Sequence, residues 1–327
     1  MVNVLMLSKW HVHAENYAKI INEQKDAKVT CIWDDDATRG KDWAKALGVD
    51  FEGDLTRALN RKDVDAVVVD APTCDHAKVI VAAAEARKHI FTEKALALTV
   101  ADCKKIADAV SKSGVKFCIS HPSLTDSLVQ YSKDAINKGL LGRVNYVHIR
   151  NGHDGSLAGW LPSYWYDVEK AGGGAMFDLG CHPMYMAAYL LGKPKRITSM
   201  FTTTYCPPPA DDNAVSVVEF ENKVIAVLET SFVRPYLKSS FEIIGTEGAI
   251  ARYEDNVIKV RSNKIPGGWF IPDAKTLPSP LPIPIRIWLD GIVEGKPIPF
   301  DLAKGIALTE LLENAQIAHN EQRIVTI

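Results

Sequence analysis

The chain has 327 residues, a formal net charge of −2, 47% hydrophobic residues and 24% charged residues. Because a single domain typically has about 100–200 residues, this length predicts two domains. The ordinary composition and near-neutral charge give no electrostatic reason to expect binding to nucleic acid or to an anionic membrane, and they favour small-molecule partners.

Short apolar runs alternate with helical patterns between residue 3 and about residue 120. The runs are Val4–Leu7, Val29–Trp33, Ala66–Val69, His89–Thr92 and Val115–Ile119. The helical stretches between them are Ala14–Gln24, Ala37–Leu47, Leu55–Asn60, Ala77–Ala86 and Val100–Ser113. Apolar strands joined by crossover helices predict a parallel sheet covered on both faces, which right-handed crossovers make a doubly wound, Rossmann-type α/β domain. Ligands of such folds lie beyond the carboxyl ends of the strands.

Apolar and polar residues alternate after about residue 140, as in a half-exposed antiparallel sheet. The expected strands are Arg143–Arg150, Ile197–Tyr205, Ala214–Phe220, Val224–Phe232, Ser239–Gly245 and Ala249–Tyr253. Glu221-Asn222 and Thr246-Glu247-Gly248 are suited to hairpin turns. This pattern predicts an α+β domain with a mostly antiparallel, open-faced sheet.

The remaining segments complete the expected organisation. The proline-rich stretch Ile265–Pro284 is expected to be an irregular surface loop, and Leu302–His319 a closing helix. We predict a dinucleotide-binding domain over residues 1–121 and a substrate-binding domain over residues 122–327. The six cysteines form no CxxC pair, and no apolar run or signal-like pattern points to a membrane or to export, so the expected location is cytoplasmic.

The turn after the first strand lacks the glycines that a dinucleotide site usually carries there. Its sequence is SKWHVHAENYA, and the first glycine of the chain is Gly40. Glycines let the backbone approach the pyrophosphate, but the attraction comes from free N–H groups and the dipole at the helix start. We therefore expect a rebuilt pyrophosphate turn formed by Ser8, Lys9, Trp10 and His11, and the alternative is a lost phosphate site.

The second strand ends in three aspartates, Asp34, Asp35 and Asp36. A carboxylate at this point of a dinucleotide fold hydrogen-bonds the adenosine ribose, which makes Asp34 the candidate. The alternative is that these aspartates only cap the next helix. Because acidic groups repel a 2′-phosphate, NAD is favoured over NADP, although Arg39 keeps the choice open.

Two further strand ends and two later segments carry recognisable motifs. The third strand runs into Ala71, Pro72 and His76, and the fourth into Glu93 and Lys94. With GGGAMFDLGCH at residues 172–182 and FEIIGTEG at residues 241–248, these motifs resemble the Gfo/Idh/MocA family of sugar and cyclitol oxidoreductases. The resemblance implies hydride transfer between a secondary hydroxyl of a sugar, cyclitol or derivative and NAD, with Ala71, Pro72, His76, Glu93 and Lys94 near the cofactor. It also implies a homodimer or homotetramer.

Oxidation of an alcohol requires a base within hydrogen-bond reach of the hydroxyl, and histidine suits this task near neutral pH. His182 is the candidate, and Asp178, four residues earlier, would lie one helical turn away. By resemblance, Lys94 hydrogen-bonds the substrate hydroxyl and favours its ionised form. The structural alternatives are a core histidine, a helix-capping aspartate and a solvated surface lysine.

The residue that follows Lys94 differs from the usual pattern of the family. The family usually has proline after it, often with a cis peptide, and this chain has Ala95. A non-proline cis bond costs about 2.5–4 kcal/mol. Either the bond is trans and Lys94 is aimed differently, or the surroundings stabilise a cis bond.

Polar and aromatic residues around the start of the second domain are expected to bind the substrate. They are His121, Arg150, His153, Trp160, Tyr164 and Trp165. Aromatic faces suit a sugar ring, and the alternative for the three large aromatics is packing under a long loop. His121 stands where many relatives carry arginine, which leaves the substrate class open.

His11 and His13, beside Glu15, also raise the question of a metal site. Two histidines at i and i+2 can ligate a metal on an extended segment. A helix would splay them apart, and His76, His153 and His182 are explained by other roles. We therefore expect no metal.

Two other functions fit the same motifs. The first is a redox-cycling lyase or glycosidase, which would retain its cofactor tightly and form no net NADH. The second is a sensor or partner subunit without catalysis, which the altered turn and the altered lysine motif suggest.

Overall fold

The computed structural model describes residues 1–273 and 275–327. The chain forms two compact units, Met1–Ser120 with Pro282–Thr309, and His121–Leu281 with Glu310–Ile327. The first unit thus takes in a late segment that the sequence had placed in the second domain. Residue 274, within the stretch expected to be an irregular loop, lies outside the described residues.

The first unit contains a six-stranded parallel sheet in the order β3-β2-β1-β4-β5-β6. Its strands are β1 (Val2–Leu7), β2 (Ala27–Trp33), β3 (Asp50–Phe51), β4 (Ala66–Val69), β5 (His89–Thr92) and β6 (Phe117–Ile119). This is the strand order of the doubly wound dinucleotide-binding fold, and the predicted α/β class is confirmed. The two-residue strand β3 was not predicted, because so short a run has no readable periodicity.

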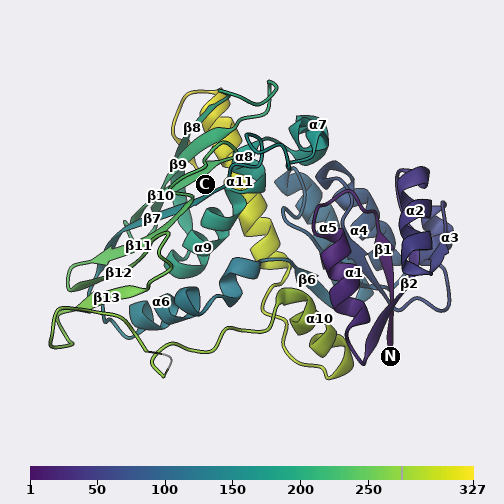
Figure 1. Ribbon diagram of the computed structural model, residues 1–327, viewed down its shortest axis with the longest axis horizontal. Helices are drawn as coiled ribbons and strands as arrows, with labels where there is room; N and C mark the ends of the chain where they lie inside the picture. The colour runs from purple at the N-terminus through teal and green to yellow at the C-terminus, as the bar shows by residue number, and fades with distance from the viewer. Residues whose placement is uncertain (274) are drawn as a thin grey trace. The chain divides into compact units, whose positions relative to one another are not determined.

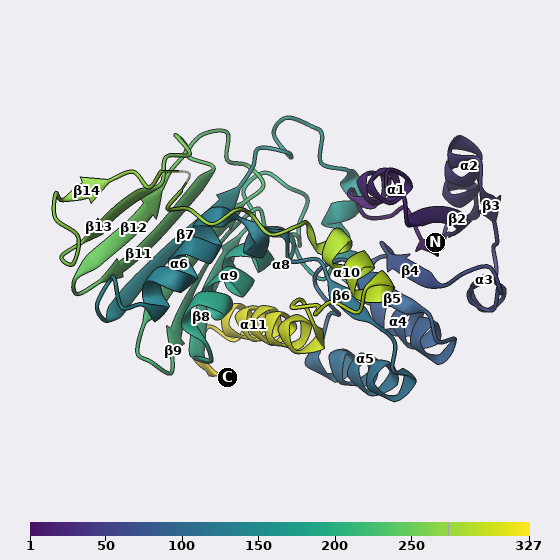
Figure 2. The ribbon, with the colours of Figure 1, turned by 90° about the horizontal axis from the view of Figure 1, so that it is seen from below.

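Helices cover both faces of this sheet. They are α1 (Ala14–Asn22), α2 (Ala37–Leu47), α3 (Leu55–Leu59), α4 (His76–Glu85), α5 (Val100–Ser113) and α10 (Pro284–Val293). Helices α1 and α2 lie on one side of the sheet, and α4 and α5 lie on the other (Figure 2). The side chain of Asp36 caps α2 by accepting from the N–H groups of Thr38 and Arg39, so the capping alternative holds for this aspartate.

The second unit contains a nine-stranded sheet in the order β14-β13-β12-β11-β7-β10-β9-β8-β15. Its strands are β7 (Val144–Gly152), β8 (Pro194–Thr202), β9 (Asn213–Phe220), β10 (Ile225–Ser231), β11 (Ser239–Gly245), β12 (Gly248–Arg252), β13 (Lys259–Ser262), β14 (Trp269–Phe270) and β15 (Val325–Thr326). Strands β10 and β7 pair in parallel, while the other neighbours are antiparallel. The prediction of a mostly antiparallel sheet is confirmed, although β14 lies within the expected irregular loop.

Helices cover one face of the second sheet and leave the other face open (Figure 1). They include α6 (Ser127–Asn137), α8 (Ala175–Asp178) and α9 (Cys181–Leu191), and α11 (Leu302–Asn320) follows near the end of the chain. The short helix α7 (Val168–Ala171) precedes α8 in the sequence. The exposed apolar side chains Met200, Val215, Ile225 and Ile244 belong to β8, β9, β10 and β11. Over the described ranges, no helix combines the length and apolar character needed to cross a membrane.

Candidate functional site

The β1–α1 turn uses its backbone N–H groups within the first unit. Four successive groups donate to partners nearby: Ser8 to Trp33 O (2.7 Å), Lys9 to Asp34 Oδ2 (2.8 Å), Trp10 to Ser8 Oγ (3.1 Å) and His11 to Asp70 O (2.9 Å). Ser8 adopts a left-handed φ of 78°, and the side chains of Trp10 and His11 are buried. A glycine-rich turn leaves such donors and the space beside them to a pyrophosphate. Here backbone carbonyl and side-chain oxygens accept from these N–H groups, and the side chains of Trp10 and His11 fill space beside them.

The start of α1 keeps the features that attract an anion. His13 occupies the N-cap position and makes no side-chain capping hydrogen bond. The first-turn N–H groups of an α-helix have no partner inside the helix, and its dipole favours a negative charge at this end. The strand edge and the helix start therefore fit a dinucleotide. Only the turn between them differs from a glycine-rich dinucleotide site.

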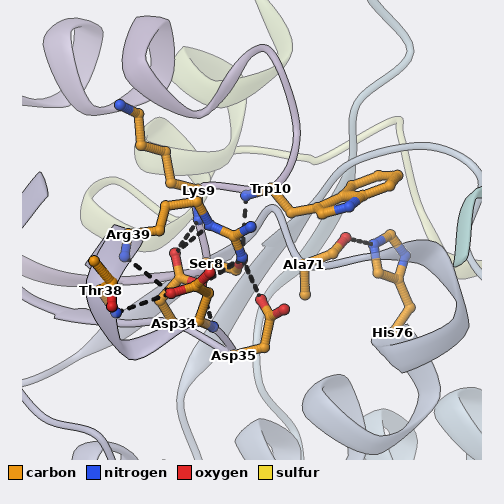
Figure 3. A network of polar contacts seen from close by, with 10 residues as sticks. Ser8, Lys9, Trp10, Asp34, Asp35, Thr38, Arg39, Ala71 and His76 are labelled. Carbon is orange, nitrogen blue, oxygen red and sulfur yellow. Dashed lines mark hydrogen bonds and ion pairs between the residues drawn. The ribbon is translucent and has the colours of Figure 1, made fainter. Parts of the chain in front are cut away.

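The carboxylate of Asp34 lies at the end of β2, where the ribose-binding group was predicted, but it forms an ion pair with Arg39. Arg39 Nε donates to Oδ2 at 3.0 Å and Nη2 donates to Oδ1 (Figure 3). The same Nη2 reaches Asp35 Oδ1 at 2.7 Å and Ser8 Oγ at 3.1 Å. Burial raises the pKa of Asp34, and the hydrogen bond from Arg39 opposes this shift. Asp34 thus presents a neutralised carboxylate to any ligand.

His76 joins the loops that follow β4 and β5. Its Nε2 lies 3.1 Å from Ala71 O, and its Nδ1 lies 3.0 Å from Ala95 O (Figure 3 shows the first contact). The ring is buried, and burial lowers the pKa of His76, so it is neutral. The Lys94–Ala95 peptide is cis, and Lys94 is buried rather than a solvated surface lysine.

Glu93, beside Lys94, is the centre of a buried polar cluster. His13 Nδ1 lies 2.9 Å from Oε1, His11 Nε2 lies 3.8 Å from Oε2, and the Tyr17 hydroxyl donates to Oε1. Burial alone would raise the pKa of Glu93, but the charges of His11 and His13 hold it well below its usual value. Sequence reasoning missed Tyr17, whose spacing of four residues from His13 on α1 was the available signal.

Asp70, at the end of β4, is a second carboxyl group that sequence reasoning missed. It is fully buried, and neither oxygen has a hydrogen-bond partner within residues 1–273 and 275–327. Burial raises its pKa well above the usual value, and the charge of Glu93 adds to this shift. The surroundings of Asp70 therefore favour its protonated, neutral form.

The glycine segment of the second unit is sterically demanding. A Cβ on Gly174 would lie 2.1 Å from Asp211 O, and Gly172 has a φ of 94°. The Asp211 carboxylate accepts from the N–H groups of Gly174 and Met176, both at 2.9 Å, and so caps the start of α8.

Asp178 and His182 lie on two successive helices rather than on one uninterrupted helix. Asp178 ends α8 and His182 belongs to the first turn of α9, with Leu179 and Gly180 between them. The backbone keeps right-handed helical angles at both intervening residues. A one-turn separation is therefore approximately retained, as the four-residue spacing predicted.

His182 is held at Nδ1 by two hydroxyl groups. Tyr185 Oη lies 2.6 Å away and Ser123 Oγ lies 3.2 Å away, while the Ser123 N–H donates to Tyr185 Oη at 3.1 Å. His121, expected to bind substrate, is buried and stacks on Tyr185 with ring centroids 4.3 Å apart. Sequence reasoning missed Ser123 and Tyr185, although Tyr185 follows His182 by three residues, on the same helical face.

His182 lines a hollow of about 430 Å³ in the second unit. Its wall also contains Asn151, Asp126 and Arg252, of which the last two form an ion pair at 2.9 Å. A hollow of this volume is in the range of small-molecule sites.

Arg150 also borders this hollow, but its guanidinium lies on the opposite face of the sheet. Its Nε donates to Glu229 Oε2 at 2.7 Å, and His148 Nε2 lies 2.7 Å from Oε1 of the same glutamate. The next residue, Asn151, donates to Leu179 O on the helix-covered face, as strand alternation requires. The hydrogen bond from His148, together with Arg150, lowers the pKa of Glu229 to about 2. The guanidinium of Arg150 therefore pairs with Glu229 and does not face the hollow, contrary to its predicted role in substrate binding.

The predicted aromatic residues differ in their exposure. The His153 ring stacks on Phe232 at 5.3 Å and meets Trp160 at 4.6 Å between centroids. Trp160 is 54% exposed, whereas Trp165 is buried and Tyr164 packs near it. Packing under the loop therefore describes Trp165, and Trp160 presents an accessible ring.

Two family profiles match the chain. The oxidoreductase family with an NAD-binding Rossmann fold matches residues 11–121, and the GFO/IDH/MocA C-terminal domain matches residues 129–251. Together they match most of the chain, and they cover the strand edge and the glycine segment described above, whereas the first match begins at His11, after most of the β1–α1 turn.

Curated relatives and solved structures agree with the profiles. The chain is 27% identical over 256 residues to the 2,7-anhydro-N-acetylneuraminate hydratase of Escherichia coli, covering 76% of this chain and 67% of that protein. It is 28% identical over 249 residues to the scyllo-inositol 2-dehydrogenase (NAD(+)) of Bacillus subtilis, covering 73% and 69%. The structure of a levoglucosan dehydrogenase with NADH and levoglucosan superimposes with a TM-score of 0.85 at 21% identity, covering 100% and 99%.

The matched segments thus span about two thirds of the curated relatives' own length, and the structural match extends over the whole fold. The predicted fold, the NAD-binding class and the oxidoreductase class are confirmed at the level of the family. The chain belongs to the Gfo/Idh/MocA family of oxidoreductases, and its first unit is that family's NAD-binding Rossmann domain.

Proposed function

We propose that the protein transfers a hydride between a secondary hydroxyl group of a sugar, cyclitol or sugar derivative and the nicotinamide of NAD. Relatives named for inositol and levoglucosan support this substrate class. The observation that carries the proposal is the histidine at the hollow of the second unit, His182, whose Nδ1 contacts Tyr185 Oη and Ser123 Oγ.

These contacts suit a general base. A histidine that accepts the hydroxyl proton at Nε2 keeps its own proton on Nδ1, which needs an acceptor. Tyr185 Oη and Ser123 Oγ each have lone pairs for that proton. They would fix the ring and stabilise the imidazolium that forms, and Asp178 would add a negative charge one turn earlier.

Lys94, in the first unit, would act on the substrate hydroxyl rather than on the histidine. An ammonium group close to the substrate hydroxyl lowers its pKa by favouring the alkoxide. Its buried position reduces screening by water, which strengthens this effect. NAD, when bound, supplies the hydride acceptor. In the first unit, Asp34, Ala71, Pro72, His76 and Glu93 would border it, with Lys9 and the start of α1 toward its pyrophosphate.

The open face of the second sheet supports self-association into a homodimer or homotetramer. Met200 is 71% exposed on β8, and Val215, paired with it on β9, is also exposed. Contiguous apolar side chains on an open sheet face typically mark a protein interface. Light scattering of the purified protein measures this directly, and a monomer at micromolar concentration would contradict it.

The test of the function is a screen of polyols and sugars with NAD, monitored by NADH absorbance, followed by His182→Ala and Lys94→Ala. We expect each substitution to lower kcat/KM by about 10²–10⁴-fold. Binding of NAD, measured by calorimetry, should be retained in His182→Ala.

Wild-type rates in either variant would remove that residue from the mechanism. Substrate turnover with tightly retained cofactor and without net NADH would replace the dehydrogenase by the redox-cycling lyase. Failure of the wild-type protein to bind NAD at millimolar concentration would replace both by a sensor.

A further inference from the structure

We propose that His11, His13 and Glu93 form a binding site for one divalent transition-metal ion, with zinc as the ion that the ligand set favours. The three residues each offer one ligand atom, and these atoms lie within 4.8 Å of one another. Two imidazole nitrogens and one carboxylate oxygen are a recurrent zinc ligand set. The proposed metal site shares Glu93 and the start of α1 with the proposed NAD site, so its test uses the metal ion without NAD.

The backbone brings both histidines to the same side. Residues 11–13 form the turn that precedes α1, which begins at Ala14. The two histidines precede the helix, so the expectation that a helix would splay them apart does not apply, and their ring centroids are 4.7 Å apart. Glu93 reaches them from the end of β5, whereas Glu15, the neighbour in sequence, pairs with Lys9 at 2.5 Å.

The spacing of the ligand atoms is close to that of a tetrahedral site. Ligands at about 2.0–2.1 Å from zinc lie about 3.4 Å from one another. His13 Nδ1 lies 2.9 Å from Oε1 of Glu93 and His11 Nε2 lies 3.8 Å from Oε2, and one ligand atom from each of the three residues lies within 4.8 Å of the others. Rotations about the side-chain bonds would bring the three ligand atoms to that spacing around the ion.

Outer contacts already orient the carboxylate. The Tyr17 hydroxyl donates to Oε1, and the Lys94 N–H donates to Oε2 at 3.0 Å. Burial raises the pKa of Tyr17, with a further contribution from Glu93, so the phenol remains a donor. Such second contacts fix the ligating groups of metal sites and tune their affinity.

Metal binding would displace protons from this cluster. The His13 N–H donates to His11 Nδ1 at 3.2 Å, which places the proton of a neutral His11 ring on Nε2, toward Glu93. Ligation through Nε2 moves that proton to Nδ1 and opens the 3.2 Å contact. Because the ion competes with protons for the ring nitrogens, its affinity would fall as the pH is lowered.

The site has one accessible side. The side chain of His13 is 44% exposed, compared with 4% for His11 and 1% for Glu93. An ion can therefore enter past His13, and a fourth position remains for water or another oxygen ligand. Three protein ligands with an open position are typical of zinc sites that bind a further molecule.

The test uses the full chain without an affinity tag, stripped with EDTA and titrated with Zn²⁺ alone in a calorimeter. We expect one equivalent to bind, with a dissociation constant that weakens about 100-fold or more in His13→Gln and in Glu93→Gln. Co²⁺ in place of Zn²⁺ should give the strong visible absorption of a tetrahedral site. Circular dichroism shows whether each variant is folded, and half-exposed His13 is the position least able to disturb the fold.

His89→Gln is the matched control, because His89 lies at the start of the same strand, β5, outside the cluster. It should bind Zn²⁺ as the wild type does. Absence of stoichiometric binding by the wild type, or equal affinity in wild type and His13→Gln, would overturn the proposal.

Discussion

The β1–α1 turn and the glycine segment at residues 172–182 differ in what occupies the space beside the backbone. The turn lacks glycine and fills its space with Trp10 and His11, whose backbone N–H groups are bonded within the unit. The glycine segment keeps its glycines because backbone occupies the space that a side chain would need, as the 2.1 Å approach to Asp211 O at Gly174 shows. Glycines can therefore be replaced where they only make room for a ligand, and they are required where neighbouring backbone leaves no room for a side chain.

The two regions also differ in the interactions that stabilise them. Around the turn, charged side chains provide the contacts, with Arg39 bound to Asp34 and the histidines gathered at Glu93. Around the glycines, one carboxylate caps a four-residue helix and the rest is close packing. Substitutions should accordingly be costliest where backbone is displaced and mildest where an exposed charge is lost.

Gly174→Ala should have the largest effect. The new Cβ would overlap Asp211 O at 2.1 Å and Asp211 N at 2.4 Å, and neither backbone atom can move without breaking the cap of α8. We expect a loss of about 3 kcal/mol or more in the free energy of unfolding, measured by urea denaturation. Gly53→Ala is the control, because its Cβ would meet Phe51 at an ordinary 3.6 Å. Equal stability of the two variants would show that the glycine segment is not sterically required.

Arg39→Ala should have the next largest effect and tests the charged turn. It removes two hydrogen bonds from the buried Asp34 carboxylate, for a loss of about 2 kcal/mol. Protonation of Asp34, whose pKa burial already raises, limits this loss. Arg57→Ala removes an exposed pair with Glu52 and should leave the free energy of unfolding almost unchanged. If both arginine variants unfold at the same urea concentration, the turn does not depend on its buried ion pair.

The sequence allowed the prediction of most of the fold, because continuous apolar strands and alternating strands leave different periodicities. It also located the strand edge that carries Asp34, His76, Glu93 and Lys94. It could not show that Arg39 would neutralise Asp34 or that Glu93 would meet His11 and His13. Glu93 and His11 are 82 positions apart in the sequence, and the strand order of the sheet brings them together. Arg39 is only five positions from Asp34, and its pairing depends on the conformation of its long side chain. Arg150 was predicted to bind substrate, but the sequence could not show that its side chain lies on the sheet face opposite the hollow, because that depends on the strand register.

Tyr185→Phe should have a smaller effect, on activity rather than on stability. It removes the hydroxyl that contacts His182 Nδ1 at 2.6 Å while it keeps the ring that stacks on His121. We expect kcat to fall about 10-fold, equivalent to about 1.4 kcal/mol, with little change in KM and with a shift in the pH profile of kcat.

Tyr189→Phe on the same helix is the matched variant, because its hydroxyl makes only a 3.4 Å contact with Gln130. It should retain wild-type kcat. A Tyr185→Phe enzyme with an unchanged pH profile would mean that the hydroxyl does not position the base, and the proton on Nδ1 would then depend on Ser123.

His148→Gln should have the smallest effect, because its ion pair lies on the open sheet face. The hydrogen bond to Glu229 raises the pKa of His148 above its usual 6.5. Its stabilising contribution, about 1 kcal/mol or less, is therefore complete below pH 6.5 and is lost as the pH rises through the raised value. The melting temperatures of wild type and variant should differ at pH 6 and converge at alkaline pH. Burial lowers the pKa of His89, so its contribution has the opposite sign and is lost as the pH falls, which makes His89→Gln the control. A His148 effect as large as that of Arg39 would show that a part-buried ion pair on the open sheet face stabilises this protein as much as the pair made by the buried Asp34, against the contrast between the two regions.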